Sequence, residues 1–179
     1  MDHDALGRLA AATDTAMVVV TAAMEGAGGW ERAGCLVGFH SQSSIDPPRY
    51  AVWLSKANHT YRVALFGDHL AVHFLGEADL ELAKHFGTVT GDEDDKFGGW
   101  EWQPGPGGVP LLVDCANRLV IRRDAVFDSG GDHVSFSGDV VEASTAEESF
   151  VPLRFDAVAG LDAAHPAEER PRPPTERAG

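Results

Sequence analysis

The feature that most constrains the fold is a series of short β-branched and aromatic runs separated by glycine- or proline-rich turns. The run Ala16–Ala23 leads into the turn sequence EGAGGW, as a buried strand does before a hairpin turn. Further strand patterns cover Ala33–Phe39, Tyr50–Leu54, Leu70–Phe74, Leu111–Phe127, His133–Ala143 and Phe150–Phe155. Six or seven strands with short helices at their edges predict a mainly β protein built as a small antiparallel barrel.

Short helices are predicted beside these strands, over Leu6–Ala16, Asn58–Phe66 and Glu77–Phe86. Asn58 is a suitable N-cap for the second helix, and Gly67 and Gly87 stand where the second and third should end. The segments Ser41–Pro48 and Gly98–Pro110 are expected to be irregular, because they are rich in proline or glycine.

The length of 179 residues fits one domain with a short appendage. We assign residues 1–161 to this domain. Residues 162–179 are rich in proline and charge, and such a segment buries too little apolar area to offset its ordering entropy. The sequence therefore predicts a disordered tail.

The chain is acidic, with a formal net charge of −14. Such a surface repels phosphate backbones and anionic lipid headgroups, so nucleic acid and membranes are poor candidate partners. No apolar run approaches the roughly 20 residues of a membrane span, and the acidic N-terminus does not resemble a signal peptide. Cys35 and Cys115 lack metal-type spacing, and we expect reduced thiols in a cytoplasmic protein.

Several motifs that would carry chemistry are missing from the sequence. It has no Walker loop, no GxGxxG between a strand and a helix, and no GxSxG elbow. His69 and His73 lie in a strand pattern, about 13 Å apart at four residues' rise, so they are expected to be surface or interface histidines. The acidic run 92–95 lacks the pattern of a calcium loop, and no metal site is predicted.

One region combines groups that could hold a phosphate. Small and hydroxyl residues follow the strand that ends at Phe39, and such a segment can bring backbone N–H groups close to an anion. Lys56, Asn58 and Thr60 then gather at the start of a short helix, where free amides and the helix dipole favour negative charge. These residues predict a phosphate site without a Walker loop.

The order of several short segments resembles the flavin reductase-like family of FMN-binding split barrels. These segments are VVVT, SIDPP, SKANHT, HLAVHFL, LAKHF, KF and GDH, and the resemblance covers about residues 14–158. It implies a Greek-key split β-barrel with a few short peripheral helices. It also implies a homodimer that binds FMN or FAD near the dimer interface and uses NAD(P)H as co-substrate.

The resemblance also implies roles for individual residues. His133, in the GDH segment, would be catalytic and lie near the nicotinamide and the flavin ring. The flavin-contacting residues would be Leu36, Val37, Gly38, Phe39, Gln42, Ser43, Ser44, Lys56, Asn58, Thr60 and Phe97. Where many reductases carry Thr-Ala-Asn-Ser-Phe, this chain has LVGFH, so polar side-chain contacts to the ring are lost or supplied by backbone.

The implied function is an NAD(P)H-dependent flavin oxidoreductase that supplies reduced flavin to a partner monooxygenase. An alternative is a flavin- or deazaflavin-binding carrier or sensor with little reductase activity, which the LVGFH segment favours. Trp100 and Trp102 either cover a flat ring or pack in the ordinary way, and the sequence leaves both readings open.

Overall fold

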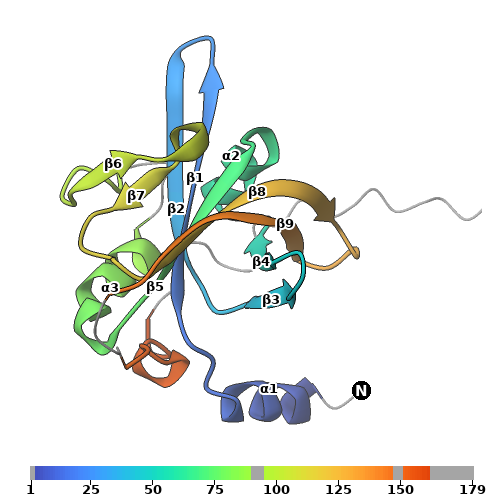
Figure 1. Cartoon of the computed structure of the whole chain (residues 1–179). Helices are drawn as coiled ribbons and strands as arrows, with labels where there is room; N and C mark the ends of the chain where they lie inside the picture. Colours follow the sequence, from blue (N-terminus) through green and yellow to red (C-terminus); the bar gives the residue numbers. More distant parts are fainter. Residues whose placement is uncertain (1–2, 90–94, 147–150, 162–179) are drawn as a thin grey trace, which may run out of the picture.

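A curved antiparallel sheet organises the chain, seen in a computed structural model that describes residues 3–89, 95–146 and 151–161 (Figure 1). Within these residues the sheet has seven strands, in the spatial order β2-β1-β5-β8-β9-β4-β3. The strands are β1 Val18–Gly26, β2 Gly29–Val37, β3 His40–Ser44, β4 Arg49–Ser55, β5 His69–Phe74, β8 Arg118–Phe127 and β9 His133–Ser144. The prediction of a mainly β, antiparallel barrel is confirmed.

The two edge strands of this sheet are neighbours along the chain. β2 ends at Val37 and β3 begins at His40, so only Gly38 and Phe39 connect one edge of the sheet to the other. The backbone N–H of Trp53 on β4 donates to the carbonyl of Phe39 at 2.9 Å, which fixes this connection against β4. The sheet thus curls until its edges meet at the connection.

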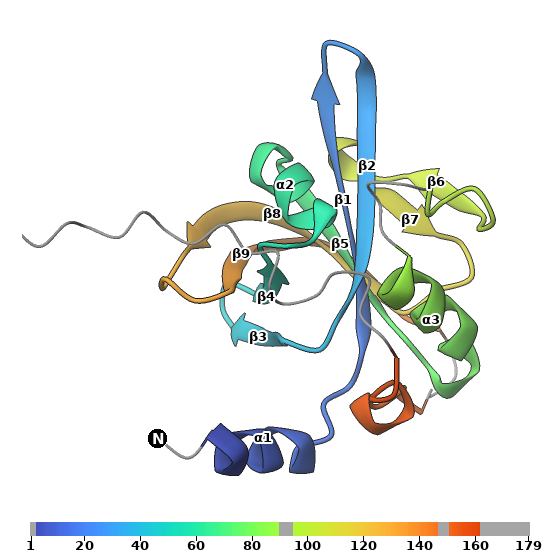
Figure 2. The ribbon, with the colours of Figure 1, turned by 180° about the vertical axis from the view of Figure 1, so that it is seen from behind.

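Short helices accompany the sheet (Figures 1 and 2). They are α1 His3–Ala12, α2 His59–Phe66 and α3 Leu80–Thr88, with 3-10 turns at Glu77–Asp79, Pro106–Gly108 and Phe155–Ala157. α2 and α3 pack against β1 and β2. α1 stands away from the sheet in both views, and its Leu6 and Leu9 are largely exposed. Gly87 lies inside α3 and does not end it, because Val89 still donates its N–H to the His85 carbonyl.

The two segments expected to be irregular each contain strand. Ser41–Ser44 belong to β3, a mostly exposed edge strand whose polar residues give no hydrophobic alternation to detect. In the glycine- and proline-rich segment, β6 Trp102–Pro104 pairs with β7 Pro110–Leu112 around a 3-10 turn. Leu111 and Leu112 therefore belong to this small sheet, and β8 begins only at Arg118.

Three expectations fall at or beyond the limits of the described residues. The predicted tail, 162–179, lies outside them, as does most of the acidic run, 92–94. The expected strand Phe150–Phe155 begins outside them, and its described part forms only single bridges, from Pro152 to Gly76 and from Arg154 to Ala16.

His73 is buried, so its assignment to the surface was wrong. It lies on β5 beneath β7, where its Nδ1–H donates to the Val19 carbonyl at 3.2 Å and its Nε2 accepts the Leu112 N–H at 3.1 Å. Because both ring nitrogens have backbone partners, a polar ring can occupy a core position. Burial lowers its pKa to about 4, so the ring is neutral at physiological pH.

Metal-ligating side chains, apolar helices and the two cysteines were the subject of further expectations. Among the described residues there is no cluster of three metal-ligating side chains, and no helix long and apolar enough to cross a membrane. Cys35 and Cys115 are both buried, with free thiols.

Candidate functional site

A small depression opens where the connection between β2 and β3 passes over β4 and β9. Its volume is about 100 Å³ and its lining residues are Leu36, Val37, Gly38, Phe39, Trp53, Ser55, Asn58 and His133. Six of these eight residues are among those implied by the family resemblance, all except Trp53 and Ser55. Residues from three separate parts of the sequence, 36–39, 53–58 and 133, therefore meet at one place on the surface.

Strand register explains why β4 and β9 contribute to this depression. Trp53 pairs with Ser135 and Ser55 pairs with His133 in the antiparallel ladder, so these side chains share one face of the sheet. Val52 and Leu54, on the opposite face, are fully buried in the core. The core side of β4 thus fixes which residues line the depression.

A wider hollow of about 430 Å³ adjoins the depression and shares Gly38, Phe39 and Trp53 with it. His40 closes one end, with its Nε2–H donating to the Ala16 carbonyl at 2.8 Å and its Nδ1 accepting the Tyr50 hydroxyl at 2.7 Å. Burial lowers the pKa of His40 and raises the pKa of Tyr50 to about 12, so both groups are uncharged at neutral pH. His40 therefore presents a neutral ring to the hollow.

His133 stands between an aromatic ring and a carboxylate. Its ring meets Phe39 edge-on, with 5.1 Å between centroids, and its Nδ1 lies 3.1 Å from an Asp132 carboxylate oxygen. A carboxylate beside Nδ1 helps to orient the imidazole and leaves Nε2 for other partners. The arrangement suits a histidine that orients a ligand.

The three residues expected to bind phosphate have different surroundings in the structure. Asn58 lines the depression, and within the described residues its side chain caps no N–H of α2. Lys56 pairs with Asp128, with 2.7 Å between Nζ and Oδ2. Thr60 is buried, and its side chain hydrogen-bonds with the Cys35 thiol, whose pKa is raised by burial. Its hydroxyl thus faces the core and does not line the depression.

Four other residues expected at the site lie apart from the depression. Gln42 and Ser43 are exposed on β3, and Ser44 is partly exposed at its end. Phe97 is buried in the core, with its ring 5.7 Å from that of Phe86 and 5.9 Å from that of Trp102. Trp102 also packs, with the Arg32 guanidinium 4.8 Å from its ring centroid.

Trp53 and Ser55 were missed by the sequence reasoning. The alternation in YAVWLS contains the signal, because Val52 and Leu54 are apolar enough to be assigned to the core, which places Trp53 and Ser55 on the other face. Asp128 gave no signal of its own, since a charged residue before a Gly-Gly turn is ordinary.

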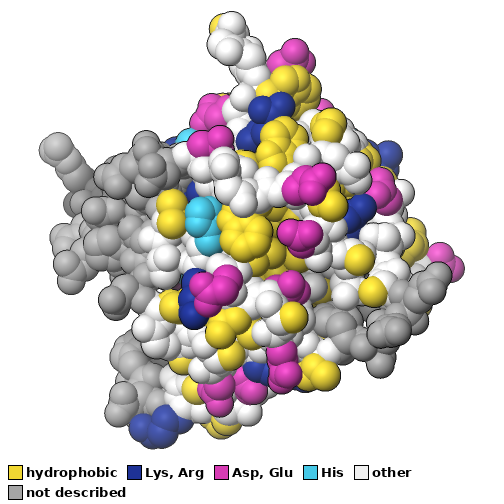
Figure 3. Space-filling view, turned by 90° about the vertical axis from the view of Figure 1, so that its left-hand side faces the viewer, with side chains coloured by type: hydrophobic (Ala, Val, Ile, Leu, Met, Phe, Trp, Pro, Cys, Tyr) yellow, Lys and Arg dark blue, Asp and Glu magenta, His cyan; other side chains and the backbone are white. Residues whose placement is uncertain are grey.

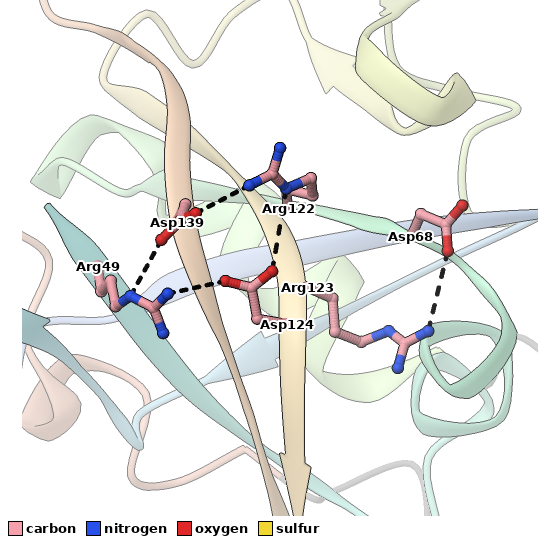
Figure 4. A network of polar contacts seen from close by, with 6 residues as sticks. All are labelled: Arg49, Asp68, Arg122, Arg123, Asp124 and Asp139. Carbon is pink, nitrogen blue, oxygen red and sulfur yellow. Dashed lines mark hydrogen bonds and ion pairs between the residues drawn. The ribbon is translucent and has the colours of Figure 1, made fainter. Parts of the chain in front are cut away.

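An ion-pair network holds together the strands that carry the site (Figure 4). Asp139 on β9 lies 3.0 Å from the Arg49 Nε on β4 and 2.9 Å from an Arg122 nitrogen on β8. Asp124 bridges the same two arginines, at 3.0 and 3.9 Å. Exposed pairs contribute little singly, but this network links three neighbouring strands side by side.

The surface as a whole is unfavourable for anions. Acidic side chains are spread over the face formed by α3, β6 and β7, around a group of hydrophobic ones, and few basic side chains appear among them (Figure 3). With a net charge of −14, an anionic group must be held by local donors.

The lining of the site fits a flat aromatic ring with an anionic substituent. Phe39, Trp53 and His133 offer ring surfaces, and Phe39 and Trp53 are exposed enough to be covered by a ligand. Asn58 lines the same depression and can donate to an anion, and so can Lys56, which is two residues earlier in the chain but is not among the lining residues. A flavin has this combination of groups.

Comparison with known proteins gives an independent result. A family model described as "Flavin reductase like domain" matches residues 10–158. The chain is 30% identical over 153 residues to the NADH:riboflavin 5'-phosphate oxidoreductase of Streptomyces pristinaespiralis, covering 84% of this chain and 80% of that protein. It is 29% identical over 143 residues to the stachydrine N-demethylase reductase subunit Stc3 of Rhizobium meliloti, covering 78% of this chain and 57% of the relative.

Solved structures show the same fold. A putative oxidoreductase from Sinorhizobium meliloti superposes with a TM-score of 0.71 at 25% identity, covering 86% of this chain and 51% of that one. Flavin reductase HpaC, complexed with NADP+, gives a TM-score of 0.68 at 20% identity, covering 83% and 92%. The chain spans only 45% to 66% of the length of several curated relatives it matches.

Proposed function

The chain belongs to the flavin reductase-like family, and we propose that it is an oxidoreductase that transfers a hydride from NAD(P)H to bound FMN or FAD. The reduced flavin would then be supplied to a partner monooxygenase. Two relatives support this: one is named an NADH:riboflavin 5'-phosphate oxidoreductase, and another a reductase subunit of a flavin-dependent monooxygenase.

The observation that carries the proposal is the meeting of Phe39, Trp53 and His133 at the point where the sheet closes. A bound flavin supplies the hydride-accepting ring. The protein's part is to cover one face of that ring with Phe39 and Trp53, to exclude water there, and to orient the nicotinamide through His133. Asn58 and Lys56 would hold the phosphate end.

Two measurements test this function. Titration with FMN should quench the tryptophan fluorescence, and Trp53→Phe should remove a large part of that quenching, because Trp53 lines the site. Steady-state oxidation of NADH or NADPH should then require added FMN or FAD. A protein that shows no quenching at high micromolar FMN or FAD would exclude the proposal.

A flavin or deazaflavin carrier remains a second candidate, favoured by the apolar LVGF segment along the depression. Such a carrier would give the same fluorescence titration. It would not turn over NAD(P)H with added flavin, and this single assay separates the two functions.

We also propose a cytoplasmic homodimer. The depression is shallow and Phe39 is 59% exposed, whereas deep ligand sites commonly form between subunits. Buried free thiols at Cys35 and Cys115 suit a reducing compartment. Light scattering that gives a mass near 19 kDa with flavin present would contradict the dimer.

A further inference from the structure

The turn between β8 and β9 brings a carboxylate to the cation expected to hold the flavin phosphate. Asp128 is the first residue of this turn, and its Oδ2 lies 2.7 Å from Lys56 Nζ. Its Oδ1 accepts the N–H of Gly130 at 2.8 Å, so the side chain closes its own turn. Gly130 has a φ of 88°, a conformation that favours glycine.

Backbone contacts fix the position of this ion pair. The Lys56 N–H donates to the Asp132 carbonyl at 2.9 Å, which ties the end of β4 to the last residue of the turn. Asp128 and Lys56 therefore belong to two segments that a backbone hydrogen bond holds together, which keeps their side chains within reach of each other. Lys56 is also the more enclosed partner, with 22% of its side chain exposed against 46% for Asp128.

Building on the proposed function, we propose that Asp128 is a specificity-determining residue that competes with the flavin phosphate for Lys56. It would lower the affinity for phosphorylated flavins relative to unphosphorylated flavin and so favour release of the product flavin.

The charges of Asp128 and Lys56 support this competition. The pKa of Asp128 is lowered, first by its hydrogen bond with Lys56 and then by the Gly130 N–H, so the carboxylate is ionised at neutral pH. Its negative charge neutralises the single positive charge of Lys56. An incoming phosphate must displace the carboxylate or lie beside it against like-charge repulsion, which weakens binding of phosphorylated ligands alone.

The test compares FMN with riboflavin, which lacks the phosphate, by fluorescence titration of the full chain. Asp128→Asn keeps an oxygen for the Gly130 N–H but removes the charge. We expect it to lower the Kd for FMN about two- to fivefold, the range that an exposed ion pair allows, and to leave the Kd for riboflavin unchanged. A second variant, Asp128→Ser, should act in the same direction.

Two controls make the result specific to the pair. Asp68→Asn removes the same charge from an 85% exposed residue on a different ion pair, and should leave the Kd for FMN unchanged. In a Lys56→Met background, Asp128→Asn should no longer tighten FMN binding, because the ammonium group for which Asp128 and the phosphate compete is absent.

Each other outcome overturns the inference. An unchanged or weaker affinity of Asp128→Asn for FMN would show that the carboxylate does not compete, or that it positions Lys56 for the phosphate. An equal gain for riboflavin would show a general effect of charge. If the wild type binds FMN and only the variant result fails, the proposed function stands, whereas a wild type that binds neither flavin removes both.

Discussion

The imidazole of His133 meets the ring of Phe39 edge-on, with centroids 5.1 Å apart and planes inclined at 66°. Phe39 belongs to the connection that closes the sheet, and His133 is the first residue of β9. The Asp132 carboxylate lies 3.1 Å from Nδ1 of the same imidazole. The histidine is therefore positioned by both the closure of the barrel and the turn before β9.

This position predicts the effect of His133→Ala. Flavin should still bind, because the ring walls from Phe39 and Trp53 remain. Flavin reduction should slow, or its NAD(P)H requirement rise, on the order of 10- to 100-fold, the loss that misplacement of a reactant produces. Stopped-flow reduction across a range of NAD(P)H concentrations measures this, and wild-type rates at all concentrations would contradict the role.

Asn58→Ala separates binding from helix stability. The side chain lines the depression and, within the described part of the chain, caps no N–H of α2, but it does hydrogen-bond with the buried Cys35 thiol. We therefore expect a small fall in melting temperature from the loss of that contact, together with a loss of about 1 kcal/mol in FMN binding. Circular dichroism and fluorescence titration test the two parts. A lower melting temperature with unchanged affinity would show a purely structural residue.

His73 predicts a loss of stability in mild acid. Its pKa is about 4 in the folded protein and 6.5 in an unfolded chain, so between these values the unfolded state binds the proton and the native state does not. Stability is thus fully present above pH 6.5 and falls as the pH drops towards 4, by about 3 kcal/mol in all. The lowered pKa of His40 acts in the same direction.

Urea unfolding at several pH values between 7.5 and 4.5 measures this dependence. Replacing His73 with glutamine should flatten the curve in that range, even if the variant is less stable at pH 7.5. A wild-type curve without slope would contradict the prediction.

Gly138→Ala should destabilise the protein strongly. A Cβ at this position would overlap the carbonyl oxygen of Arg122 on the neighbouring strand, and backbone atoms cannot move aside cheaply. A cost of about 1–3 kcal/mol or more is expected. Gly28→Ala, where no atom lies within 4 Å, is the matched control and should change the melting temperature little.

The strands that could be predicted from the sequence are those whose buried residues form an apolar or β-branched pattern. The β-branched run of β1 and the apolar residues of β5 were read correctly as strands, because β-branched and apolar residues are buried along most of both. β3 and β6 were missed, since their polar, exposed or proline-containing residues show no hydrophobic alternation. His73 was misplaced because its two backbone partners come from distant segments.

Part of the lining of the depression could be anticipated from the sequence. Phe39, Asn58 and His133, to which the resemblance gives site roles, do meet there, and the roles themselves belong to the proposed function. The ion pair between Lys56 and Asp128 depends on the β8–β9 turn lying beside the end of β4. No local sequence pattern predicts this arrangement. Likewise, Thr60 has a hydroxyl suited to phosphate, yet its depth in the core depends on packing around Cys35.

The two-residue connection at Gly38 and Phe39 has a consequence for motion. It joins strands at opposite ends of the hydrogen-bonding order, and both residues line the depression. A ligand seated there would restrain both ends of the sheet at once. Amide hydrogen exchange in β2 and β3 would then slow together on binding, although five strands separate them across the sheet.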